Sequence, residues 1–187
     1  MNSMLAPGLL LAAPRLGDPN FDRSVVLLAA HGDEGGFGWV LNGRTSMSLD
    51  ELVRRAGLEP SQKLPGSARV GGPVASDQVW LLYRSEERLA GVEDQFEVAP
   101  GITASASRKA LEQIAEKGAP ESLITLVGYA GWAPKQLANE IRFGSWLPSD
   151  VTAATVFDVA SSELWSFAYG RLGVTPMSFT TRTVGSA

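Results

Sequence analysis

The residues of this sequence that could carry chemistry lie in four short stretches rich in glycine and aromatic side chains. His31 ends the apolar run "SVVLLAAHG", and Asn42-Gly43-Arg44 follows the next apolar run. His31 could act as an acid or base near neutral pH or contact an anion, and Arg44 could offer a planar fork to a carboxylate or phosphate. A strand-end imidazole bonded to the backbone and an ordinary Asn-Gly turn would explain the same residues without any function.

The stretch "VGGPV" places Gly71 and Gly72 before a proline. Two residues without side chains can bring bare backbone N–H groups close to a ligand. Tight packing against a neighbouring strand is an equally good explanation, so both interpretations stay open.

The fourth stretch reads "VGYAGWAPKQLANEI". An apolar strand over 122–128 is expected to end at its glycines, and a helix is expected to begin at Pro134, a residue favoured at the first helical position. The N–H groups at such a helix start form a natural anion site. Alternatively, Tyr129 and Trp132 simply pack the top of the sheet.

Leu137 and Ile141 are four residues apart on this helix and should be buried, and Gln136 and Glu140 occupy the adjoining stripe. We therefore predict that Trp132, Gln136 and Glu140 form one wall of a pocket. The opposite wall would be the Gly71–Val74 backbone or Asn42. A surface amide–carboxylate pair is the alternative.

Several kinds of site are excluded or disfavoured by composition. The chain has no cysteine and one histidine, so thiolate chemistry, iron–sulfur clusters and zinc sites built from Cys and His are excluded or improbable. No phosphate-binding lysine loop, nucleophile elbow or dinucleotide glycine motif is present. We expect no metal and no cofactor. The net charge of −4 and the lack of a basic run argue against specific DNA binding.

The strands and helices that must position these residues follow one another without strict alternation. Strands are expected at 8–13, 24–32, 36–43, 78–84, near 96–98, 122–128 and 155–160, with weak strand character from Thr175. Helices are expected at 48–56, 107–117, from 134, and from Ser161 or Ser162, the last burying Leu164, Phe167, Ala168 and Leu172. Ser48-x-x-Glu51 is a capping box that begins the first helix. This order predicts one α+β domain over residues 1–187 with a mixed sheet.

The apolar N-terminal segment is predicted to be a strand and not a secretion signal, because no basic residue precedes it and Pro7-Gly8 interrupts it. No apolar run reaches the roughly 20 residues that cross a bilayer. We expect a cytoplasmic protein without a membrane segment.

Five motifs in register resemble the AlgH/YqgE family of bacterial proteins. They are "GLLLAAPRLGDPNFDRSVVLLAAHGDEGGFGWVLNG", "GGPV", "VGYAGWAPKQLANEI", "SWLPSD" and "VFDV…LWSFAYGRLGV". The resemblance runs from about Met4 to Ala187. It implies an α+β fold whose strands curl into a pseudo-barrel flanked by helices. The family name reflects a proposed role in transcriptional regulation, without a recognisable DNA-binding motif. This chain ends "VGSA", where the family usually has Gly-His-Ala.

Three functions remain open at this point. The first is a regulatory or binding protein that acts through a protein partner or a small anionic ligand. The second is an enzyme using Glu140, His31 or Asp158, which turnover of a metabolite library would reveal. The third is a regulator that binds nucleic acid directly, which salt-dependent DNA affinity would reveal.

Overall fold

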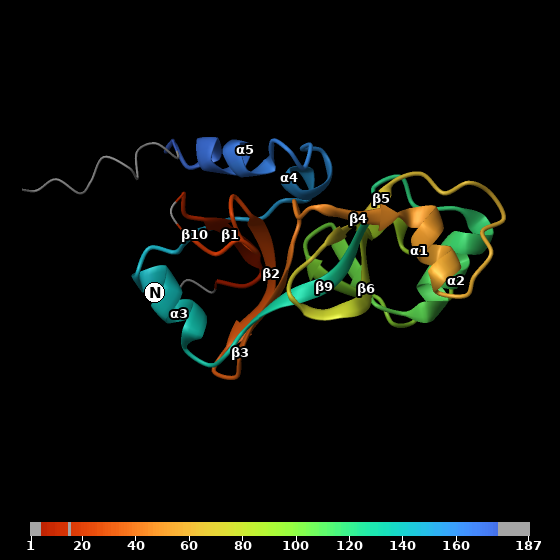
Figure 1. The fold of residues 1–187 in the computed structure, drawn as a ribbon, viewed down its shortest axis with the longest axis horizontal. Coiled ribbons are helices and arrows are strands. Elements are labelled where there is room, and N and C mark those ends of the chain that lie inside the picture. Colours follow the sequence, from red (N-terminus) through yellow and green to blue (C-terminus); the bar gives the residue numbers. More distant parts are fainter. Residues whose placement is uncertain (1–4, 15, 176–187) are drawn as a thin grey trace, which may run out of the picture.

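The computed structural model describes residues 5–14 and 16–175, which form a curled β-sheet with helices on its outside (Figure 1). Its strands are β1 Gly8–Ala12, β2 Val25–Gly32, β3 Gly35–Val40, β4 Thr45–Ser48, β5 Ser67–Val70, β6 Val74–Arg84, β7 Phe96–Ala99, β8 Ile102–Ser105, β9 Ile124–Trp132 and β10 Trp146–Ser149. Its helices are α1 Leu49–Arg55, α2 Arg108–Lys117, α3 Gln136–Arg142, α4 Ala153–Phe157 and α5 Leu164–Arg171, with a short 3-10 turn at Ser85–Glu87.

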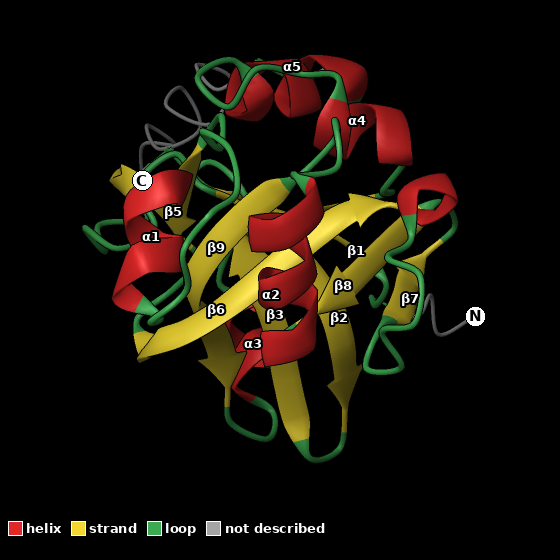
Figure 2. Ribbon diagram, turned by 90° about the vertical axis from the view of Figure 1, so that its right-hand side faces the viewer, coloured by secondary structure: helices red, strands yellow, loops and turns green. Residues whose placement is uncertain are grey.

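The long strand β9 joins the two halves of the sheet. The strand order is β10-β1-β2-β3-β9-β6-β8-β7, and the β4–β5 pair attaches to β9 through β5. Every pairing is antiparallel except β5 with β9, which is parallel. In Figure 2, α2 lies across one face of the sheet, and α4 and α5 lie along its top. The predicted α+β fold with a mixed, curled sheet is confirmed.

β1 and the first half of β2 are buried on both faces, as their continuous apolar runs predict. Leu9, Leu11 and Leu27 point into a core that α4 and α5 cover. Leu10 and Leu28 alternate with them and point into a second core, which includes Trp132 and Trp146. A third core packs α1 and α2 against the β5–β6 side. The site residues are therefore carried by strands whose positions are fixed from two sides.

Two predicted helices begin where the sequence places them. Ser48 is the N-cap of α1, and its hydroxyl accepts the Glu51 N–H at 3.1 Å. Ser107 precedes α2, and the four residues predicted to face inward on α2, Ala110, Leu111, Ile114 and Ala115, are buried. A capping residue and an apolar stripe with a period of 3.6 residues were sufficient to predict these two helices.

The strand predicted over 155–160 is wrong. Residues Ala153–Phe157 form α4, and the Thr152 hydroxyl caps it by accepting the Thr155 N–H at 3.2 Å. A five-residue apolar run is too short to show whether its apolar positions repeat with the period of a strand or of a helix. The cap at Thr152 was the overlooked signal.

The last helix is rotated relative to its predicted face. α5 buries Leu164, Trp165, Ala168 and Tyr169, whereas Phe167 and Leu172 are 43% and 39% exposed. The indole Nε1 of Trp165 and the hydroxyl of Tyr169 both donate to the Ala12 carbonyl, at 2.9 and 3.0 Å. These two hydrogen bonds to β1 decide which face turns inward. The weak strand expected from Thr175 and the "VGSA" ending lie outside the described residues, apart from Thr175 itself.

The glycines of "VGYAGW" do not end their strand, contrary to the prediction. β9 continues through Trp132, and α3 begins at Gln136 after Lys135, which has a left-handed φ of 66°. Gly128, with a φ of 72°, and Gly72 lie in backbone contact. A Cβ on Gly72 would stand 2.1 Å from the Tyr129 carbonyl, and one on Gly128 would stand 2.5 Å from the Gly72 carbonyl oxygen. These glycines therefore serve close backbone packing.

Candidate functional site

The structure divides the nine predicted site residues into groups. Trp132, Gln136 and Glu140 form one hydrogen-bonded cluster beside His31. Asn42, Arg44 and Gly72 line a cavity elsewhere, and the lining of that cavity does not include Trp132, Gln136 or Glu140. Gly71 and Tyr129 contact neighbouring strands of the sheet. The single pocket predicted between Trp132 and the Gly71–Val74 segment therefore corresponds to two separate places in the molecule.

Glu140 is half-buried and accepts hydrogen bonds from three side-chain donors. Its Oε2 accepts the indole N–H groups of Trp132 and Trp146 at 2.9 and 2.8 Å, and its Oε1 accepts the Gln136 amide at 2.8 Å. Gln136 in turn accepts the Ala133 N–H at 2.9 Å. This carboxylate joins β9, α3 and β10. Sequence reasoning missed Trp146, whose only signal was its place in "SWLPSD".

His31 lies next to this cluster across the sheet. It is paired with Gly36, which is paired in turn with Trp132. A Cβ built on Gly36 would lie 3.5 Å from both the His31 ring and the Trp132 ring. Gly36, which has no side chain, thus lies between the imidazole and the indole on three paired strands.

Gly71 and Tyr129 hold strands together. Gly71 donates its N–H to the Val127 carbonyl at 2.7 Å and accepts the Val40 N–H at 2.8 Å, so it bridges β9 and β3. Tyr129 packs its ring against Phe37, with centroids 4.9 Å apart. For both residues, the packing interpretation accounts for the contacts seen.

Asn42 fixes one wall of a cavity at the start of β2. Its Oδ1 accepts the Val25 N–H at 2.8 Å, and its Nδ2 donates to the Arg23 carbonyl at 2.9 Å. Arg23 has a left-handed φ of 49°, which costs energy for a residue other than glycine. Asn42 therefore does more than close an Asn-Gly turn, because its amide anchors the neighbouring loop.

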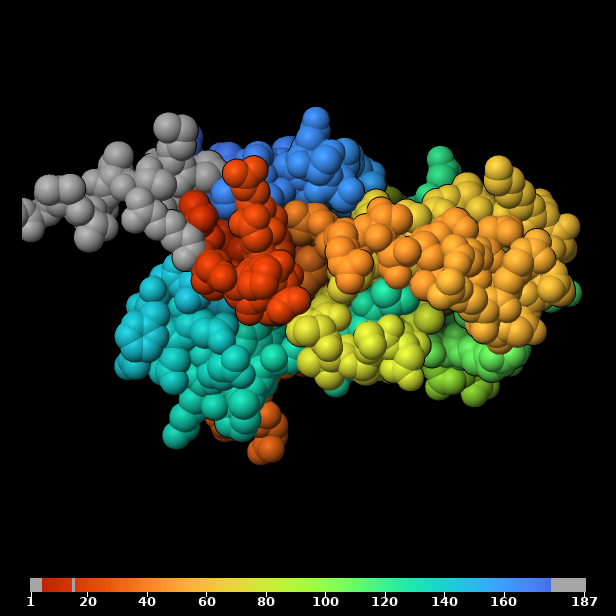
Figure 3. All heavy atoms as spheres, in the orientation of Figure 1, coloured from red at the N-terminus to blue at the C-terminus, as the bar shows by residue number. Residues whose placement is uncertain are grey.

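The cavity lies where three distant stretches of the chain meet, and we call it the Ser24–Arg44 cavity. Its volume is about 310 Å³. The polar residues and glycines that the argument uses are Asn20, Asp22, Ser24, Asn42, Arg44 and Gly72. In Figure 3 the red, orange and yellow stretches of the chain, which supply these residues, meet near the middle of the face shown.

Two groups of the cavity lack partners within the described residues. The Ser24 side chain is only 3% exposed, and its hydroxyl oxygen has no hydrogen-bond partner there. Arg44 is exposed and forms no ion pair within residues 5–14 and 16–175. A buried polar group normally has a partner. Sequence reasoning found Arg44 but missed Ser24, because a serine before an apolar strand is too common a pattern.

Neither a metal site nor a membrane helix is present in the part of the chain that the structure describes. No three His, Asp or Glu side chains come close enough together there to hold a metal ion. No described helix has the length and apolar character needed to cross a bilayer.

Comparison with known proteins extends over nearly the whole chain. A family model described as AlgH-like matches residues 9–177. The chain belongs to the AlgH/YqgE family. Its relatives include a UPF0301 protein of Anaeromyxobacter sp. (strain Fw109-5), 39% identical over 95% of this chain and 92% of the relative. A UPF0301 protein of Myxococcus xanthus is 40% identical over 92% of this chain and 93% of the relative.

Two solved structures share the fold of this AlgH-like chain. The solution structure of the AlgH protein from Pseudomonas aeruginosa matches with a TM-score of 0.75 and 30% identity, covering 100% of this chain and 98% of that one. The crystal structure of protein DIP2367 from Corynebacterium diphtheriae matches with a TM-score of 0.72 and 24% identity, covering 91% and 88%. The resemblance found from the five sequence motifs is confirmed.

Proposed function

We propose that this AlgH-like chain is a binding protein whose Ser24–Arg44 cavity takes a small anionic ligand. The observation that carries the proposal is the buried, unpartnered Ser24 hydroxyl in the wall of a cavity that also contains an unpaired arginine. Leaving a buried hydroxyl unbonded costs on the order of 1–3 kcal/mol, which a bound ligand would recover. A guanidinium offers paired donors that match carboxylate or phosphate oxygens.

The other polar groups of the cavity narrow the class of ligand. Asp22 adds a carboxylate to the lining, and Asn20 adds an amide. A polyanion would be repelled by Asp22, whereas a ligand that also carries hydrogen-bond donors would satisfy it. Hydroxy- and amino-carboxylates have this combination, and a cavity of about 310 Å³ accommodates molecules of that size.

The candidate catalytic carboxylates are already bonded to other side chains of the protein, which favours a binding function over catalysis. The Glu140 carboxylate is hydrogen-bonded to three structural donors, and Asp158 is ion-paired with Arg84. A general base must lie within hydrogen-bond reach of the proton that it abstracts, and these two carboxylates are directed at other side chains of the protein instead. In this proposal the protein acts in the cytoplasm, and ligand occupancy changes how the surface around the cavity meets a protein partner.

The proposal is tested by screening for stabilisation and then measuring affinity. Hydroxy-carboxylates, amino acids and phosphate esters are added singly, and the thermal midpoint is recorded. A ligand at 100 times its dissociation constant stabilises the folded state by about 2.7 kcal/mol. Calorimetric titration of each positive compound then compares the wild type with Arg44→Gln and Ser24→Ala.

We expect Arg44→Gln to weaken binding at least tenfold. Ser24→Ala should weaken binding without lowering the stability of the unliganded protein, because no hydrogen bond within the described chain is lost. Arg55→Gln is the matched control, since Arg55 is exposed on α1, where it pairs with Glu51. A panel without a single stabilising compound, or wild-type affinity in Arg44→Gln, contradicts the proposal.

A further inference from the structure

Arg69 lies on the opposite face of β5 from the Ser24–Arg44 cavity. Its neighbours on the strand face the other way: Ala68 packs into the core below α1 and α2, and Val70 lines the Ser24–Arg44 cavity. Because successive side chains of a strand alternate, Arg69 points toward the segment that joins α4 to α5. Whatever Arg69 does is therefore spatially separate from the function proposed above.

Arg69 is a cation without an anionic partner. Its guanidinium is half-buried, and it makes one hydrogen bond, from Nη1 to the Leu41 carbonyl at 3.2 Å. No carboxylate within residues 5–14 and 16–175 forms an ion pair with it. Burial lowers its pKa, and no acidic group offsets that effect. A guanidinium has five N–H donors, so most of its donors remain for another acceptor.

A cavity of about 400 Å³ stands in front of this guanidinium. Residues 158–161, the first part of the segment that joins α4 to α5, line the same cavity, and so do Ser122 and Ile124. The backbone N–H groups of Val159, Ala160 and Ser161 have no acceptor within the described residues. Free backbone N–H groups in residues that line the same cavity as a guanidinium are a combination of donors that suits an oxyanion.

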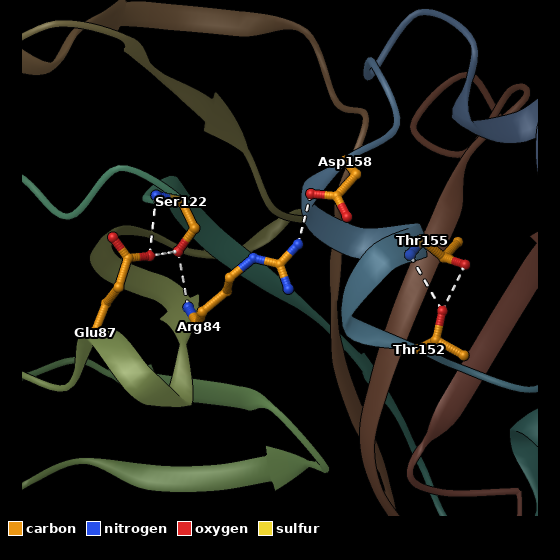
Figure 4. A network of polar contacts seen from close by, with 6 residues as sticks. All are labelled: Arg84, Glu87, Ser122, Thr152, Thr155 and Asp158. Carbon is orange, nitrogen blue, oxygen red and sulfur yellow. Dashed lines mark hydrogen bonds and ion pairs between the residues drawn. The ribbon is translucent and has the colours of Figure 1, made fainter.

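The acidic groups near this cavity are engaged or exposed. Figure 4 shows Arg84 donating to Asp158, at 2.5 Å, and Glu87 accepting from the Ser122 hydroxyl. Glu87 also accepts the N–H groups of Glu121 and Ser122, at 2.7 and 3.1 Å. Asp158 is therefore neutralised by Arg84. Glu121 is exposed and also lines the cavity, where a carboxylate disfavours long polyanions.

We propose that Arg69 and the backbone of Val159–Ser161 form a second anion site, which binds a single phosphate group. Arg69 supplies the positive charge and two parallel donors, and the loop supplies further donors. Phosphate geometry matches the guanidinium fork. The phosphate comes either as the free ion or as the end of a phosphomonoester. The site does not depend on the Ser24–Arg44 cavity and makes no use of its residues.

The test is a titration of the ¹⁵N-labelled full chain with inorganic phosphate, followed by amide chemical shifts. We expect saturable shifts at Val159, Ala160 and Ser161. Arg69→Gln should weaken the affinity at least tenfold. Arg44→Gln should leave it unchanged, which separates this site from the Ser24–Arg44 cavity. A second titration with adenosine monophosphate distinguishes the sources, because tighter binding than free phosphate assigns the site to an esterified phosphate.

Stability provides a second readout. Removing an unpaired, half-buried charge should not lower the thermal midpoint of the unliganded protein, so Arg69→Gln is expected to unfold at or above the wild-type temperature. Wild-type phosphate affinity in Arg69→Gln would overturn the proposal. The absence of saturable shifts at Val159–Ser161 in the wild type would overturn it as well, whether or not the variant folds.

Discussion

At the scale of single residues, Glu140 shows how a candidate catalytic group can be a structural one. Its two oxygens accept from Trp132, Trp146 and Gln136, which come from β9, β10 and α3. Phe21 adds an edge contact to Trp146, with ring centroids 5.4 Å apart. A carboxylate that receives charge-assisted hydrogen bonds from three directions fixes the positions of the groups that donate them.

Glu140→Gln should therefore reduce stability. A glutamine keeps one acceptor oxygen but places an amide donor against the Gln136 amide. We expect a loss of about 1–3 kcal/mol in the free energy of unfolding. Urea titration measures it, with Glu34→Gln, in the exposed turn between β2 and β3, as the control. Equal stability of the two variants would return Glu140 to the list of candidate binding residues.

Glu87 makes the stability depend on acid. Desolvation raises the pKa of its carboxyl, but hydrogen bonds from the Ser122 hydroxyl and from the N–H groups of Glu121 and Ser122 outweigh that effect, so the pKa lies below its ordinary value of 4.5. A lowered pKa stabilises the folded state above pH 4.5, and this contribution is lost as the pH falls through the folded-state pKa.

We expect Glu87→Gln to be less stable than the wild type at neutral pH. The difference between the two unfolding free energies should shrink below pH 4.5, because protonation removes the same charge from the wild type. Urea titrations at several pH values between 3 and 7 check this. A difference that stays constant over that range would show that Glu87 gains nothing from its hydrogen bonds to residues 121–122.

At the scale of elements, the Gly71–Val74 segment crosses β9 in close backbone contact. Gly72 lies where the chain passes from β5 to β6, and Gly128 lies beside it in β9. Because neither residue has a side chain, their backbones can come into contact. In the sequence, Gly71 and Gly72 suggested either a ligand-binding segment or close packing against a neighbouring strand. Their role in the structure is to let two backbones approach, which positions Gly72 at the wall of the Ser24–Arg44 cavity.

Gly72→Ala should cost about 2–4 kcal/mol, because its Cβ would collide with the Tyr129 backbone at 2.1 Å and its φ is 155°. Gly170→Ala is the matched control. Gly170 lies in α5 with open space around it, so alanine there should stabilise by about 0.5–1 kcal/mol. Thermal unfolding distinguishes the two. A Gly72→Ala variant as stable as the wild type would contradict the close packing described.

The elements that the sequence predicted well have strong local signals. β1, β2 and β3 have buried apolar runs, α1 has a capped start, and α2 has a clear stripe. The predictions failed where tertiary contacts determine the type or the orientation of an element. α4 is too short for a period, and the face of α5 is set by two hydrogen bonds to Ala12. The short strands β4, β5, β8 and β10 exist through pairing with partners distant in sequence, which no local pattern reveals.

The candidate site was predicted only in part for a similar reason. Arg44 and Asn42 could be found because their residue types are suited to anion binding. Ser24 could not, since its importance depends on burial without a partner. Arg69 was overlooked because it sits in an ordinary short strand, and only the fold shows that no carboxylate of residues 5–14 and 16–175 pairs with it.

At the scale of the whole molecule, the curled sheet carries two anion-binding candidates on opposite faces of β5. Val70 lines one cavity and Arg69 the other. The net charge of −4 is thus compatible with anion binding at two isolated arginines, while it disfavours a long nucleic-acid surface. Family membership accounts for the shared architecture, and the proposed functions rest on these local charges.

The most direct test of the central claim is a crystal structure of the full chain with the tightest-binding carboxylate from the screen. The account predicts density for the ligand in the Ser24–Arg44 cavity, with an anionic oxygen about 2.7–3.0 Å from the Arg44 guanidinium and an acceptor within hydrogen-bonding distance of the Ser24 Oγ. Ligand density at another place, with only water between Ser24 and Arg44, would contradict it.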